Sequence, residues 1–114
     1  MILQVAIVVR EEQCEKILKK FADAGINGST VVDCAGSATA ISDDEYMCQQ
    51  PVFSGLRAMV KQNSHLHKMI LSVVDEDKRQ SAHDIAVQVL GDLSKPNTGI
   101  IFALPLIYAE GIEK

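Results

Sequence analysis

Tryptophan is absent from this sequence of 114 residues, and aromatic residues make up only 4% of it. No apolar run reaches the roughly 18 residues that a membrane-spanning helix requires, so no transmembrane helix is expected. The apolar start, MILQVAIVVREE, also lacks the basic region and the small-residue cleavage site of a signal peptide. We therefore expect a cytoplasmic protein that begins with a strand and approaches a membrane only through a partner.

Cysteine and basic residues are scarce as well. The three cysteines, Cys14, Cys34 and Cys48, form no C-x-x-C pair and are odd in number, which argues against a disulfide framework. The 11 Lys and Arg residues are scattered and are outnumbered by 15 Asp and Glu, which gives a net charge of −4. A nucleic-acid-binding protein needs a basic patch, so we expect no nucleic-acid partner.

Apolar residues, in contrast, make up 47% of the chain, enough for one domain over residues 1–114 to bury a core. Residues 2–9 are apolar except for Gln4, a pattern typical of a strand buried on both faces. Further strands are predicted at 29–34, 68–74 and 99–104. Pro105 is expected to stop the last of them, and the tail after it is a candidate for a short edge strand.

Two long helices are predicted between these strands. The first begins at Glu11 and ends at Gly25, because glycine takes a positive φ without a Cβ penalty. The second covers 75–91, with Asp75 or Asp77 as its cap. The stripes of residues expected to be buried are Cys14, Ile17, Leu18, Phe21 and Ala22 in the first helix, and Ala82, Ile85, Ala86, Val89 and Leu90 in the second.

The predicted order is β-α-β, then a polar loop at 36–50 and a short helix at 52–61, then β-α-β. This order indicates an α+β protein of the ferredoxin-like, split βαβ class, with two helices on one face of a four-stranded antiparallel sheet. The second face would be left uncovered, although the strands carry apolar residues on both faces. We therefore expect subunits to associate through that face.

One segment resembles the P-II nitrogen-regulatory family and its P-II-like relatives. Residues 24–38, AGINGSTVVDCAGSA, are similar to the family pattern AGITGMTVTEVKGFG, and GIIFA at 99–103 is similar to the family's fourth strand, GKIFV. The positions that match in the first segment are Ala24, Gly25, Ile26, Gly28, Thr30, Val31 and Gly36. Chain length, element order and the long loop after the second strand also match.

The resemblance implies a non-enzymatic signalling protein that forms a homotrimer. Small effectors, often adenine nucleotides, bind in clefts between the subunits of such proteins, and the T-loop after the second strand docks on a target such as a transporter or an enzyme. In this chain the T-loop-like insertion would be residues 36–66. The residues implied as ligand-binding are Thr30, Gly36, Ser37, Lys95, Asn97, Thr98 and Gly99. Those implied for the partner-binding loop are Asp43, Asp44, Tyr46 and Arg57.

The chain departs from the family in its phosphate-binding segment. The family pattern TGKIGDGKIF is replaced by DLSKPNTGIIF, which lacks most of the glycines and leaves Lys95 out of register. A triphosphate needs cationic or N–H partners, and the sequence offers too few of them for strong ATP binding to be expected. The sequence therefore does not identify the effector. Tyr46 lies in DDEYMCQQ, whereas the tyrosine that is modified in classical members lies in TELYRG. The different context argues against the same modification of Tyr46.

Two histidines offer a candidate metal site. His65 and His67 alternate in HLH and would project to one side of an extended segment. With a third ligand such as Asp77 or His83 they would hold a metal, which supports an alternative function as a divalent-metal-binding trimer resembling the cation-tolerance family. Two histidines in a loop are more often simply solvated.

A cysteine pair, an acidic run and a basic pair are weaker candidate sites. A redox pair of Cys34 and Cys48 is disfavoured by acidic neighbours. The acidic run at 43–45 is a candidate cation site but is usually a solvated loop, and Arg57 with Lys61 is more often a solvent face than an anion site. No nucleophile has an adjacent base, so an enzyme ranks last.

Overall fold

The computed structural model describes residues 1–36, 67–96 and 98–112. Residues 1–32 and 68–114 form one unit, which holds both long helices and most of the sheet, and residues 33–67 form a second. The elements are β1 (Ile2–Val8), α1 (Glu11–Asp23), β2 (Ser29–Cys34), β3 (His67–Val74), the 3-10 turn η2 (Glu76–Lys78), α4 (Arg79–Leu90) and β4 (Ile100–Pro105).

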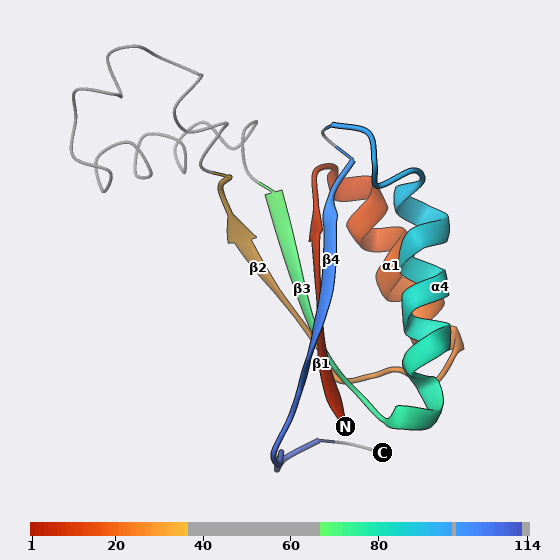
Figure 1. Ribbon diagram of the computed structural model, residues 1–114, viewed down its shortest axis with the longest axis vertical. Coiled ribbons are helices and arrows are strands. Elements are labelled where there is room, and N and C mark those ends of the chain that lie inside the picture. Colours follow the sequence, from red (N-terminus) through yellow and green to blue (C-terminus); the bar gives the residue numbers. More distant parts are fainter. Residues whose placement is uncertain (37–66, 97, 113–114) are drawn as a thin grey trace, which may run out of the picture. The chain divides into compact units, whose positions relative to one another are not determined.

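The four strands form one sheet in the order β2-β3-β1-β4, in which β1 runs antiparallel to both of its neighbours. Figure 1 shows α1 and α4 side by side on the same face of this sheet. The chain is therefore an α+β protein with a four-stranded antiparallel sheet and two long helices among its described residues. This architecture is compatible with the predicted ferredoxin-like class.

The core lies between the helices and the sheet. From α1 it contains Cys14, Ile17 and Phe21, and from α4 it contains Ala82, Ala86 and Leu90. The strands contribute Ile2, Ala6, Val8, Ile70 and Val74, while Leu18, Ile85 and Val89 pack against the cluster from the side. The predicted helical stripes are thus confirmed except at Ala22, which is exposed because it falls at the outer edge of the α1 stripe.

Glycines end both long helices as predicted. Gly25 follows the last turn of α1 with φ +78°, and Gly91 follows α4 with φ +84°. The predicted caps of the second helix are wrong, since a 3-10 turn precedes it and α4 begins only at Arg79. Neither Asp75 nor Asp77 caps α4; its N-cap residue is Lys78, which makes no side-chain capping bond and instead donates its ammonium to the Gly25 carbonyl at 2.9 Å.

The two predictions about the end of the chain have different outcomes. β4 ends at Pro105 as predicted, although Pro105 is its last paired residue, opposite Ile2, and not the first residue beyond it. The predicted edge strand of the tail is wrong for the described residues 106–112, which form no strand. The short helix predicted at 52–61 lies outside the described residues.

Candidate functional site

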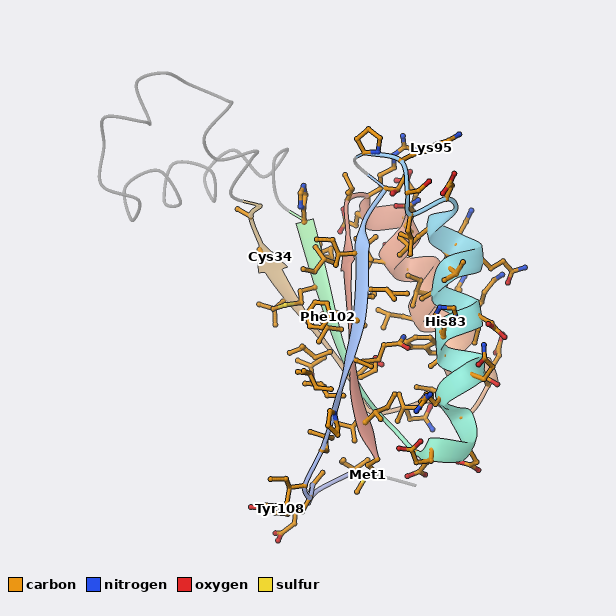
Figure 2. The ribbon with its side chains drawn as sticks, viewed as in Figure 1. Met1, Cys34, His83, Lys95, Phe102 and Tyr108 are labelled. Carbon is orange, nitrogen blue, oxygen red and sulfur yellow. The ribbon has the colours of Figure 1, made fainter. Side chains whose placement is uncertain are left out.

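The two faces of the sheet can be told apart by the packing of β4. Ile101 is opposite Ala6 and packs against the core. Because strand residues alternate between faces, its neighbours Ile100, Phe102 and Leu104 project from the other face. Figure 2 shows Phe102 directed away from the helices. These three side chains are 55%, 44% and 49% exposed.

The same alternation extends this second face across the sheet. The strand register places Leu3, Val5 and Ile7 opposite Val73, Leu71 and Met69 on one side and opposite Leu104, Phe102 and Ile100 on the other. We call these nine residues the apolar face. On β2, Ser29 shares a hydrogen bond of 2.8 Å with Ser72, which lies on the helix side opposite Gln4. Thr30 and Val32 therefore project on the side of the apolar face.

The apolar face contains no ionisable side chain and offers no group for acid–base or nucleophilic chemistry. A contiguous apolar surface of this kind is uncommon on monomeric proteins and typically marks an interaction site. The prediction that a partner subunit buries this second face stays a prediction, since three of its side chains are about half exposed in the single chain. The side chains of the apolar face can support association through apolar contacts, and none of them can transfer a proton or act as a nucleophile.

Three predicted ligand-binding residues come together in the connection from α4 to β4. The Thr98 hydroxyl donates to the Lys95 carbonyl at 2.8 Å, and the Lys95 amide donates to the Asp92 carbonyl at 3.2 Å. The Asp92 carboxylate accepts from the Ser94 amide at 3.0 Å and from its hydroxyl at 2.6 Å. These two bonds lower the pKa of Asp92 and hold the turn together.

Gly99 closes this connection for a steric reason. Its φ is +129°, and a Cβ added there would lie 2.7 Å from the Ile7 carbonyl oxygen. The backbone of β4 therefore enters the sheet against β1 at a point where only glycine fits. Glycine is therefore required by the fold at position 99.

Thr30 lies on β2 and the Lys95–Gly99 connection leads into β4, and these two strands are the opposite edges of the sheet. Within one chain the structure therefore does not bring Thr30 to Lys95, Thr98 and Gly99. Gly36 follows β2 and is half-buried. The other predicted residues lie outside the described residues, namely Ser37, Asp43, Asp44, Tyr46, Arg57, His65 and Asn97.

The metal and redox candidates gain no support from the described residues. His67 is the first residue of β3 and is half-buried, and no group of three potential metal ligands occurs in the described part of the chain. Cys14 is in the core. Burial, and secondarily the charge of Asp33, raises the pKa of the Cys34 thiol, which disfavours its reactive thiolate form.

Sequence reasoning missed a groove of about 390 Å³ beside β4. Its lining residues are Ile2, Gln4, Arg79, Gln80, His83, Ile101, Phe102 and Ala103. One wall is the first half of α4, where Figure 2 places His83, and the other is the middle of β4. Gln4 is the one polar residue within the apolar run 2–9, but this feature alone does not indicate which distant residues it meets.

A smaller hollow of about 170 Å³ lies where the turn after α1, the end of β3 and the tail meet. It is lined in part by Asn27, Asp75, Lys78 and Ile112. The Lys78 ammonium on its wall already donates to the Gly25 carbonyl, so this cation serves to tie η2 to the end of α1.

No protein-family model matches the chain, and no curated protein matches it significantly. Among the residues that the structure describes, no helix is both long and apolar enough to cross a membrane.

Proposed function

We propose that this chain is a non-enzymatic regulatory protein of the ferredoxin-like class that works as a cytoplasmic homotrimer. Its subunits associate through the apolar face. A small effector, with an adenine nucleotide as the first candidate, binds in the clefts between subunits, and the segment 36–66 contacts a protein target such as a transporter or an enzyme. The resemblance to the P-II-like proteins supplies this combination of properties.

The observation that carries the proposal is the exposure of the β4 side chains of the apolar face. Three large side chains of β4 remain about half exposed on it, and the six that flank them on β1 and β3 are apolar too. Fully burying one such side chain stabilises a protein by about 1.5–3 kcal/mol. Association through this face thus gives a strong driving force without any polar group to desolvate.

The location of the candidate ligand residues supports a shared site. Thr30 and the Lys95–Gly99 connection belong to opposite edges of one sheet, so a single ligand meets both only if two chains contribute. This is the arrangement that effector binding between subunits requires.

Leu104→Asp tests the proposal, because it places a charge in the exposed part of the apolar face. We expect the unmodified protein to have the mass of a trimer by light scattering and the variant to have that of a monomer with an unchanged circular dichroism spectrum. Ala22→Asp is the matched control, since it adds the same charge at an exposed position of α1. That control should remain a trimer.

Calorimetric titration with ATP and ADP tests the ligand half of the proposal. Binding should occur in the unmodified protein and in the Ala22→Asp control and be lost in Leu104→Asp, because the site needs two subunits. A monomeric unmodified protein at micromolar concentration would refute the assembly. Nucleotide binding that survives in the monomeric variant would refute the shared cleft.

A further inference from the structure

The strand β4 is an edge of the sheet, and β1 is its only partner in the described sheet. The phase of its hydrogen bonds follows from the Leu106 amide, which donates to the Met1 carbonyl at 3.1 Å. In an antiparallel ladder, hydrogen-bonded pairs alternate with pairs that exchange no bonds. Leu104, Phe102 and Ile100 therefore bond to β1, while Ile101 and Ala103 direct their N–H and C=O groups away from it.

Pro105 agrees with this phase. It stands opposite Ile2, two residues after Ala103, so the N–H that proline lacks would have pointed outward. A proline at this position costs the β1–β4 ladder no bond and ends the outward row of donors. The open edge is therefore short. Between Gly99 and Pro105, the two residues Ile101 and Ala103 direct their N–H and C=O groups outward.

The groove coincides with this open edge. Ile101, Phe102 and Ala103 line it from β4, and Arg79, Gln80 and His83 line it from α4. A strand added to β4 would therefore have its backbone at the edge and every second side chain over the groove.

A buried polar side chain forms part of the groove. Gln4 is only 4% exposed and lines the groove. Its amide nitrogen donates to the Ala82 carbonyl at 3.3 Å, which fixes the side chain. No buried side-chain oxygen or nitrogen of the described residues lacks a partner.

The charged side chains that line the groove indicate what kind of ligand it would bind. Both ionisable side chains in its lining, Arg79 and His83, are basic, although the chain carries a net charge of −4. Each has an acidic neighbour, with Arg79 at 3.7 Å from Glu76 and His83 at 3.3 Å from Asp84. These contacts are exposed, and exposed pairs hold their partners weakly, so a carboxylate from a ligand can compete for both basic groups.

We propose that the β4 edge and this groove bind an extended acidic peptide segment of a partner protein by strand addition. The peptide backbone pairs with Ile101 and Ala103, and an acidic side chain meets Arg79 and His83. The short edge, closed by Pro105, fits a peptide better than the six-residue β2 of a second copy. This site goes beyond the proposed function, because it uses the strand edge and not the apolar face.

The test uses two end-blocked five-residue peptides, one alternating Glu and Val and one alternating Lys and Val, titrated into the full ¹⁵N-labelled chain. We expect the Glu peptide to shift the amide signals of Ile101 and Ala103 and to slow their hydrogen exchange. The Lys peptide should bind at least about tenfold more weakly, as loss of a charge-assisted contact implies.

Ala103→Pro removes one outward N–H and no bond of the β1–β4 ladder, so it should weaken the Glu peptide by about tenfold or more. Ala103→Ser is the matched control, which retains the N–H and should bind like the unmodified chain. If Ala103→Pro fails to fold, N-methylation of alternate peptide amides removes the same bonds from the side of the ligand and should abolish binding.

Equal binding of the two peptides, or binding by Ala103→Pro as tight as by Ala103→Ser, would overturn the proposal. The proposal would also be overturned if the amides of Ile101 and Ala103 were already protected from hydrogen exchange in the free protein and lost that protection in Leu104→Asp. In that case a second copy of the chain would occupy the edge. Titration of the monomeric Leu104→Asp variant separates this result from a failure of the trimer, since its edge should still bind the Glu peptide.

Discussion

Gly99 is the residue whose identity the structure explains most directly. It stands where the P-II-like pattern has a lysine, and the resemblance to that pattern implies a ligand-binding role for it. In the structure it has φ +129°, and the Ile7 carbonyl oxygen occupies the space of a Cβ. Its backbone role is thus sufficient to account for a glycine, whether or not a ligand lies nearby.

We expect Gly99→Ala to lower the free energy of unfolding by about 1–3 kcal/mol, since this backbone region is nearly restricted to glycine. Urea unfolding at one fixed protein concentration measures the loss. Gly91→Ala is the control, because Gly91 also has a positive φ, +84°, but open space around it. It should cost less than Gly99→Ala, and an equal cost would show that the contact with Ile7 is unimportant.

Cys34 gives a prediction about pH. Burial, and then the neighbouring Asp33 charge, raise the pKa of its thiol above the ordinary value, so less of it is thiolate at any pH below that pKa. Alkylation by iodoacetamide at pH 8 should therefore be slower in the folded protein than in urea, and the rate should keep rising toward higher pH. Peptide mass spectrometry separates Cys34 from the other two cysteines.

Asp33→Asn provides the control for Cys34. Removing the negative charge should lower the thiol pKa and speed alkylation of the folded protein at pH 8, while the rate in urea stays nearly the same. Alkylation of folded Cys34 as fast as in urea would show that its environment does not protect it.

At the scale of elements, most of the described fold could be predicted because periodicity reports burial directly. The spacing of Cys14, Ile17 and Phe21 identified the buried side of α1, and the β-branched run identified β2 as residues 29–34. Gly25 and Gly91 marked helix ends because left-handed backbone favours glycine. These signals depend on neighbours in the sequence, which is why they needed no tertiary information.

The failures concern features that depend on distant neighbours. Asp75 and Asp77 are typical capping residues, but a 3-10 turn shifts the start of α4 beyond them. Pro105 was expected to lie just beyond β4, but at an edge a proline whose nitrogen faces outward is compatible with pairing, so it is the last residue of the strand. The groove beside β4 joins Gln4 to α4 residues far along the chain, and no local pattern reveals such a meeting.

The apolar nature of the second sheet face could be predicted from the sequence, but the positions of the candidate ligand residues relative to one another could not. The prediction that apolar residues would occupy the second sheet face is confirmed on β1, β3 and β4. The ligand residues carried over by resemblance fall on opposite edges of one sheet, a separation that a linear motif does not encode. The residues assigned to the partner-binding loop lie outside the described residues and remain predictions.

For the whole molecule, stability and assembly are linked through the apolar face. If subunits bury that face together, folding and association form one equilibrium, and mass action makes the unfolding midpoint depend on protein concentration. For a trimer that unfolds to three chains, a tenfold higher concentration adds two thirds of the 1.4 kcal/mol that a factor of ten represents, or about 0.9 kcal/mol per chain.

We therefore expect the urea midpoint of the unmodified protein to rise with concentration, while that of Leu104→Asp stays constant because the charged variant unfolds as a monomer. The Ala22→Asp control should keep the concentration dependence, which separates loss of association from a general effect of added charge. A dimer would show a smaller increment, about 0.7 kcal/mol per chain for the same factor of ten. A midpoint of the unmodified protein that is independent of concentration would mean that the chain folds alone with its apolar face in water.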